Sequence, residues 1–179
     1  MLKTKTGKLS LAVLDGASKE KLPCSLHIEL SDGSCFKPAS REKQELFTEK
    51  HVPDLILGED YNRYLNVGRN KSFDSIHMTK GKAEFIMPTG KAILFIFHGH
   101  EYEPIKDEIF IKSGATLHRE YKMARIENMA KLGWMNGDMH THFSRWTPAD
   151  NHIWMRVMEC EDLYAINNMA YKHLGYDES

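Results

Sequence analysis

The sequence predicts a mainly β fold, with an antiparallel β-sandwich over residues 1–125 and one βαβ unit over residues 126–179. Most of the first two-thirds alternates apolar and polar side chains in short segments that end at tight-turn residues. After about residue 126 the pattern changes to strand, helix, strand, which is typical of the start of a parallel sheet. The chain has 179 residues, 41% of them hydrophobic, so it is long enough to bury a core.

The N-terminal elements are two strands followed by a long polar excursion. Lys8–Asp15 alternates apolar and polar residues, and Ser25–Leu30 repeats the pattern before an Asp-Gly turn. Residues 36–80 are polar and irregular, and we expect one short helix near Arg41–Phe47. These segments supply the first half of the predicted sandwich.

Regular alternation returns in the middle of the chain. We expect four further strands there, over Lys82–Met87, Lys91–His98, Glu108–Lys112 and Thr116–Ala124. Short strands joined by tight turns favour two packed sheets, in which alternate side chains face one core.

The last third is predicted to be α/β. Ile126–Leu132 is a short helical connector, and Gly137–Thr141 is a strand that enters a polar loop. Pro148–Glu161 has helical apolar spacing with Asp150 near its start, a favourable place for a negative charge. Leu163–Ile166 is the second strand of the unit.

Charge and composition limit the possible partners. The net charge of −1 argues against binding to nucleic acid or to an anionic membrane, and the apolar runs are too short to span a bilayer. The N-terminus does not resemble a signal peptide, so localisation stays open, with secretion or a periplasmic location possible for a parent protein. Cys24, Cys35 and Cys160 are an odd number, which leaves either free thiols or one Cys24–Cys35 bridge.

The candidate site is a pair of histidines on the Gly137–Thr141 strand and just after it. His140 and His142 are two residues apart, so on a strand both imidazoles project from one face and can converge on one or two metal ions. Asp138 could orient a ligand, and Asp150 is a candidate oxygen ligand. The alternative is a pair of polar strand residues that bind no metal.

Other polar and aromatic residues have simpler interpretations. His98-Gly99-His100 is a second His-x-His, which we expect to lie in a loop, and Glu101 is expected to be a solvated loop charge. Trp146 could line a substrate pocket or pack as an ordinary aromatic residue. Cys160 falls on the apolar face of the predicted helix.

Two stretches resemble known families. Gly133–His142, which reads GWMNGDMHTH, and the later Cys160–Ile166 resemble the PHP (polymerase and histidinol phosphatase) superfamily, in particular the CehA/McbA-like metallohydrolases. Gly7–Asp15 with the following Leu22-Pro23 resembles a carboxypeptidase-regulatory-like sandwich of the transthyretin or immunoglobulin type.

The resemblance implies a hydrolase with two or three zinc, manganese or iron ions at the mouth of a seven-stranded (β/α)7 barrel. His140 and His142 would be ligands, with Asp150 as a looser match, and a metal-bound water would attack an ester, amide or phosphoester in a small-molecule substrate. The sequence departs from the family at Asn167-Asn168, where an Asp-His pair is usual, and it ends after two barrel strands. We therefore expect this chain alone to be inactive.

The alternative function is a non-catalytic β-sandwich module that binds carbohydrate or a partner protein. An exposed aromatic platform on the sandwich would favour that alternative, whereas a polar sandwich packed tightly against residues 126–179 would favour the enzyme. A short piece of parallel sheet with an open edge also predicts a homo-oligomer formed through the C-terminal unit.

Overall fold

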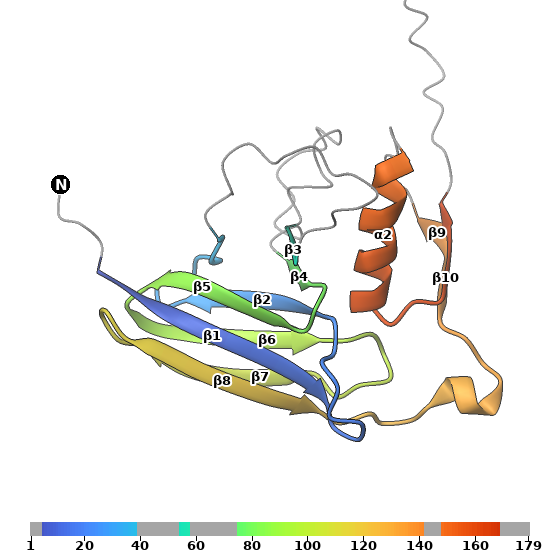
Figure 1. The fold of residues 1–179 in the computed structure, drawn as a ribbon, viewed down its shortest axis with the longest axis horizontal. Helices are drawn as coiled ribbons and strands as arrows, with labels where there is room; N and C mark the ends of the chain where they lie inside the picture. Colours follow the sequence, from blue (N-terminus) through green and yellow to red (C-terminus); the bar gives the residue numbers. More distant parts are fainter. Residues whose placement is uncertain (1–4, 39–53, 58–74, 142–147, 169–179) are drawn as a thin grey trace, which may run out of the picture.

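The computed structural model describes residues 5–38, 54–57, 75–141 and 148–168, and every structural statement below concerns these residues. Eight strands form two sheets, which are followed by a separate strand–helix–strand unit at one end of the sandwich (Figure 1). The expected helix near Arg41–Phe47 lies outside the described residues. Within the described part of the chain, no helix is long and apolar enough to cross a bilayer.

The larger sheet has five strands in the order β3-β4-β2-β6-β7, and every neighbouring pair is antiparallel. Three of its strands match the prediction to within three residues at each end. The excursion over residues 36–80, which was expected to be irregular, contributes two strands of three residues each. The five strands are β2 (Cys24–Leu30), β3 (Leu55–Leu57), β4 (Ile76–Met78), β6 (Gly90–Phe97) and β7 (Ile105–Ile111).

The smaller sheet has the order β5-β1-β8, where β1 spans Thr6–Asp15, β5 Lys82–Pro88 and β8 Thr116–Met123. β1 pairs with β5 antiparallel but with β8 parallel, so the expectation of a wholly antiparallel sandwich is wrong at this one pair. After β7 the chain crosses to the other sheet, and β8 runs along the free edge of β1 in the same direction.

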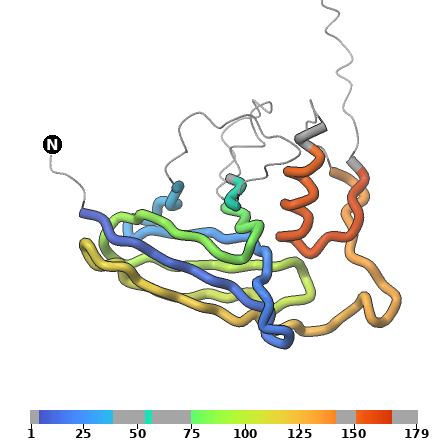
Figure 2. Tube along the Cα trace, viewed as in Figure 1, coloured from blue at the N-terminus to red at the C-terminus, as the bar shows by residue number. Residues whose placement is uncertain are grey.

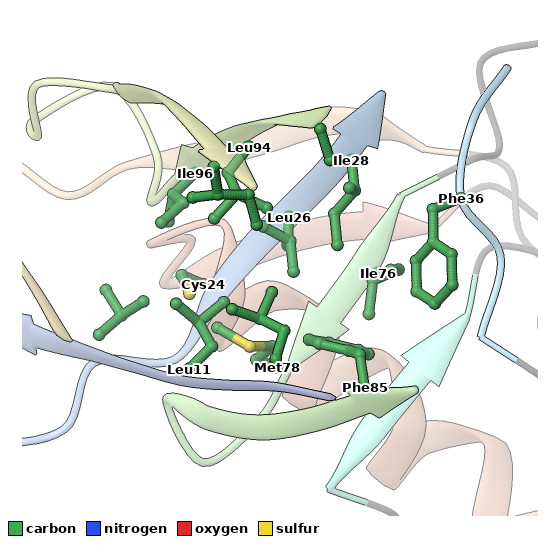
Figure 3. Close-up of a cluster of buried hydrophobic side chains, with 14 of the residues drawn as sticks. Leu11, Cys24, Leu26, Ile28, Phe36, Ile76, Met78, Phe85, Leu94 and Ile96 are labelled. Carbon is green, nitrogen blue, oxygen red and sulfur yellow. The ribbon is translucent and has the colours of Figure 1, made fainter. Parts of the chain in front are cut away.

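The core lies between the two sheets. Alternate residues of β1, β2 and β6 point inward and are buried, among them Leu11, Leu26 and Leu94 (Figure 3). Leu55 of β3 packs against this core, whereas Ile56 on the same strand does not belong to it. The inner and outer faces of the five-stranded sheet are therefore set by the period-2 alternation of its strands.

The C-terminal unit consists of β9 (Gly137–Thr141), α2 (Pro148–Cys160) and β10 (Ala165–Asn168). β9 and β10 are parallel neighbours, which confirms the predicted strand–helix–strand order. The connector to β9 leaves the end of β8 beside the end of β1 and contains only a short 3-10 turn, η2 (Met129–Leu132) (Figure 2).

Helix α2 packs on the outer face of the five-stranded sheet. Ile153 and Val157 of the helix contact Ile56 of β3 in a second, much smaller apolar cluster. Four of the five residues of β9, by contrast, are exposed. The structure thus has a mainly β fold with two packed sheets, as predicted, but the described residues beyond the sandwich form only one strand–helix–strand unit and no barrel.

Candidate functional site

The predicted metal site begins on β9. His140 is exposed on this strand, and the carboxylate of Asp138 accepts a hydrogen bond from the backbone N–H of His140 at 2.9 Å. In this arrangement Asp138 bonds the backbone of its own strand, whereas the sequence predicted that it would orient a metal ligand. Asp138 and His140 project from the same face of β9, since they are two residues apart.

The rest of the predicted ligand set is not brought together by the described residues. His142 and Trp146 lie outside them, and Asp150 lies in the first turn of α2 with its side chain undescribed. Throughout the described ranges, no three His, Cys, Asp or Glu side chains are grouped closely enough to bind a metal ion. The ligand role of His140, His142 and Asp150 stays a prediction.

A cluster of polar side chains lies instead at the seam between α2 and the sandwich. Just after α2 ends, Glu161 accepts a hydrogen bond from the Ser25 hydroxyl on the outer face of β2. The same hydroxyl lies 2.9 Å from Nδ1 of His77 on β4, and Glu161 Oε1 lies 3.7 Å from that nitrogen. Ser25 and His77 are both buried under the C-terminal unit.

The next residue, Asp162, makes a second set of contacts with the sandwich. Asp162 Oδ1 lies 3.6 Å from His98 Nε2, and its Oδ2 accepts a hydrogen bond from Arg125 at 3.3 Å. Gly99 has a positive φ of 57°, and a Cβ there would lie 2.6 Å from the Cβ of Asp162. The loop after β6 can therefore approach Asp162 this closely only with glycine at position 99.

Glu101 fixes the connector that leads to β9. Its side chain accepts hydrogen bonds from the Met129 backbone N–H at 3.2 Å and from Asn136 Nδ2 at 3.0 Å. Arg125 Nε lies 3.5 Å from the same carboxylate. Glu101 is only 6% exposed, so the expectation that it is a solvated loop charge is wrong. The sequence gives no local sign of this, because every partner of the carboxylate is at least 24 residues away.

Burial changes the protonation of this seam. The pKa values of His77 and His98 are lowered from 6.5, mainly because burial disfavours the charged imidazolium, although Glu161 and Asp162 act in the opposite direction. Nearby, the Tyr102 hydroxyl donates a hydrogen bond to Asp15 at 2.6 Å, and this bond, with those from the Ser18 and Ala17 backbone N–H groups, lowers the pKa of Asp15 to about 2. Because their pKa values are lowered from 6.5, the neutral form of His77 and His98 is favoured at pH 7.

The Ser25–His77–Glu161 cluster does not have the geometry of a nucleophilic triad. In such a triad the serine and the acid contact opposite ring nitrogens of the histidine, so that a proton can pass from one to the other. Here both Ser25 and Glu161 approach Nδ1, and Ser25 is buried. The cluster joins α2 to the sheet and presents no nucleophile to a substrate.

A different group of side chains, some half-buried and some exposed, lies on the part of the same outer face that α2 does not cover. We call it the aromatic strip, and it runs over β2, β6 and β7. Phe97 is 41% and Phe110 60% exposed, and the ring of Phe95 lies between them. The strip consists of His27, Phe95, Phe97, Lys106 and Phe110.

Strand register explains why these residues share one face. Phe95 lies directly between His27 of β2 and Lys106 of β7. The His27 and Phe95 ring centroids are 5.8 Å apart, and Lys106 Nζ lies 5.2 Å from the Phe95 centroid, within cation–π range. Phe97 is paired with Ser25, so this end of the strip adjoins the seam with α2.

Comparison with known proteins identifies no family for this chain. No protein-family model matches the sequence, and no curated protein matches it.

Several solved structures resemble it weakly. The Bacillus anthracis TIE protein has a TM-score of 0.41 at 15% identity over 68% of this chain and 18% of its own. The minor pilin GBS52 of Streptococcus agalactiae has a TM-score of 0.43 at 10% identity over 69% of this chain and 46% of its own. The Bacillus cereus major pilin BcpA has a TM-score of 0.38 at 16% identity over 68% of this chain and 30% of its own. The chain thus spans less than half the length of each of these three.

These findings correct the predicted family and activity. The resemblance to the PHP superfamily and its CehA/McbA-like hydrolases is wrong, because no model of that family matches the sequence and the described residues form no barrel. The assignment as part of a zinc- or manganese-dependent hydrolase of esters, amides or phosphoesters is wrong with it. Short local motifs such as Asp138–His140 recur by chance, and the described structure surrounds this one with exposed residues and no further ligands.

Proposed function

We propose that this chain is a non-catalytic β-sandwich module that binds carbohydrate through the aromatic strip. The observation that carries the proposal is the exposure of Phe97 and Phe110 on a regular sheet face that α2 leaves uncovered. Exposed apolar patches often mark binding sites, and Phe97 and Phe110 are two exposed aromatic side chains on one sheet face.

The arrangement of the strip suits an elongated sugar chain. From Lys91, the partner of Phe110, to Phe97 is six residues along β6, or roughly 20 Å at the rise of a β-strand. Polar groups lie between the rings, namely His27, Lys106 and Glu108. Sugars combine apolar C–H faces with hydroxyl groups, so a ligand of this kind matches alternating rings and hydrogen-bonding groups.

The same pattern disfavours a protein partner as the main ligand. The centre of a protein–protein interface is usually dry and apolar, with charges confined to the rim. In the aromatic strip the centre carries a lysine, Lys106, over the Phe95 ring, and the exposed rings lie towards the ends. A flat face with polar groups at its middle is better suited to a hydrated ligand.

The test is a glycan array followed by calorimetric titration with the best oligosaccharide. Phe97→Ala and Phe110→Ala should each weaken binding about 3- to 10-fold, the equivalent of the 0.5–1.5 kcal/mol that one aromatic stacking contact contributes. Ile86→Ala is the matched control, because Ile86 is an equally exposed apolar residue on β5 in the other sheet. It should leave the affinity unchanged.

Two results would refute the proposal. One is the absence of binding to every glycan tested, with the variants and the wild type indistinguishable. The other is an equal loss of affinity in Ile86→Ala, which would locate the binding elsewhere. A protein ligand that depends on Phe97 and Phe110 would replace carbohydrate with the alternative partner class.

The finer type of the sandwich belongs to the same proposal. We infer a transthyretin- or immunoglobulin-like arrangement, supported by one three-stranded and one five-stranded sheet packed face to face. The division into domains at residue 125 is likewise an inference, and limited proteolysis that cleaves between β8 and β9 would support it.

A further inference from the structure

Strand β9 is an edge strand of the described structure that carries little charge. It pairs with β10 on one side, and no described strand lies on its other side. The edge strands β5, β7 and β8 each carry two or more charged side chains, which discourage pairing with another chain. The remaining edges, the three-residue strand β3 and β10, the neighbour of β9, carry no charge. β9 carries one carboxylate, Asp138, and is otherwise Gly, Met, His and Thr.

The sequence of β9 is self-complementary about its central residue. Asp138 and His140 flank Met139 symmetrically, so two copies of β9 placed antiparallel with Met139 opposite Met139 bring each Asp138 opposite the partner's His140. A two-fold axis through the Met139 pair makes both contacts identical, as an isologous interface requires. We propose that a second copy of this chain pairs with β9 in this register.

The hydrogen bond within β9 is compatible with such pairing. In the single chain the Asp138 carboxylate accepts the backbone N–H of His140. In the pair, that N–H can donate to a backbone carbonyl of the second β9, and the Asp138 carboxylate can accept instead from the imidazole N–H of the partner's His140. The exchange replaces a local side-chain bond with a β-ladder bond and a cross-strand Asp–His contact.

Apolar surface around β9 gives the pair further area to bury. Trp134 is 67%, Met135 77% and Met139 70% exposed. Together these side chains expose on the order of 500 Å² per copy, a large part of the roughly 800 Å² per partner in a standard-sized interface. Trp134 and Met135 lie just before β9 in the chain, separated from it only by Asn136.

Sedimentation velocity over a concentration series tests the proposal. The wild type should form a dimer, and Asp138→His and His140→Asp should each raise the dissociation constant about tenfold or more, because each places like groups opposite each other. Both positions are exposed, so the variants should fold, which circular dichroism can verify. The double variant Asp138→His/His140→Asp restores unlike pairs across the axis and should dimerise like the wild type.

A mixing experiment makes the test specific to the register. The two single variants, mixed one to one, should form a heterodimer, because one supplies two histidines and the other two aspartates. A wild type that stays monomeric, or a double variant and a mixture that both fail to associate, would overturn the proposal. Phe97 lies in the sandwich, away from β9, so Phe97→Ala should leave the dimer dissociation constant unchanged. The dimerisation test and the carbohydrate-binding test can therefore fail separately.

Discussion

The sandwich and the C-terminal unit are stabilised in different ways. The sandwich has a continuous apolar core drawn from both sheets, including Leu11, Leu26 and Leu94. Among its described side chains, the C-terminal unit has three buried apolar residues, Ile153, Val157 and Cys160, with Trp154 partly buried beside them, and its position on the sandwich depends on polar contacts. Apolar burial is non-directional, whereas ion pairs and hydrogen bonds need particular partners. The sandwich should therefore tolerate single substitutions better than the C-terminal unit, whose attachment depends on particular side chains and on their protonation.

The sandwich and the C-terminal unit also differ in the surfaces that they expose. The outer face of the sandwich combines a rigid sheet with exposed rings, which suits binding. The C-terminal unit has two strands, mostly exposed and joined only to each other. Two strands alone are marginally stable, so this unit should be the first part of the described structure to open.

Removing core volume should have the largest effect. Leu94→Ala deletes a fully buried side chain and should reduce the free energy of unfolding by about 2–5 kcal/mol. Urea denaturation followed by circular dichroism measures this loss. Ile86→Ala, on the exposed face of β5, should change stability by no more than about 0.5 kcal/mol. Comparable losses in the two variants would show that the core does not dominate.

Removing Arg125 should have a smaller and more local effect. Arg125→Met leaves the carboxylates of Glu101 and Asp162 without their shared cation, at a cost of about 2 kcal/mol. Hydrogen exchange should accelerate over residues 126–136 and 161–168, while β2 and β6 keep their protection. The control is Arg156→Met, because Arg156 pairs only with Glu159 on the exposed surface of α2. Unchanged exchange at residues 161–168 would contradict the role of the seam.

Lowering the pH should weaken the same contacts between α2 and the sandwich, with a smaller effect than Arg125→Met. His77 faces Ser25 and Glu161, and His98 faces Asp162 and Arg125; burial lowers the pKa of both histidines below 6.5. The two neutral histidines therefore contribute fully to the stability of the contacts between α2 and the sandwich above pH 6.5. This contribution is lost as the pH falls through their lowered pKa values, because the state in which these contacts are open binds protons more readily.

Hydrogen exchange of residues 161–168 at pH 7.5, 6.5 and 5.5 measures this effect. Exchange, corrected for its intrinsic pH dependence, should become faster in acid. His77→Gln and His98→Gln should flatten the dependence. Protection that increases as the pH falls would mean that Glu161 and Asp162 outweigh burial, and it would reverse the inferred direction.

Divalent metal should have the smallest effect. Among the described residues β9 offers only Asp138 and His140 as ligands, so millimolar Zn²⁺ or Mn²⁺ should raise the melting temperature by no more than about 2 °C. His140→Ala should remove that shift, and His100→Ala, in the other His-x-His, should not. A large shift that is lost in His140→Ala would strengthen the predicted ligand role of His140, His142 and Asp150.

Much of the fold could be predicted from the sequence, because its strands follow local alternation. β1, β5, β8 and β9 begin and end within two residues of the predicted limits. β3 and β4 were missed because three residues are too few to show a period. The parallel pairing of β1 with β8 depends on how the chain crosses between sheets, which no local pattern records.

The polar seam and the aromatic strip were harder to predict. Glu101 and Asp162 have partners far away in the sequence, so their burial leaves no local trace. The strip did leave a signal, since β6 is apolar on both faces, with Phe95 and Phe97 alternating with Leu94 and Ile96. The GWMNGDMHTH motif is a short local resemblance, and the family that it indicated is wrong.

We propose that the sandwich, through its aromatic strip, is the part of the molecule that binds the ligand. A ¹⁵N-edited NMR titration with the best oligosaccharide from the glycan array tests it most directly. Binding at the strip should shift signals only in β2, β6 and β7, most strongly near His27, Phe95, Phe97 and Phe110, and should leave β9 and β10 unshifted. Shifts centred on β9 and β10, with the aromatic strip unaffected, would contradict it.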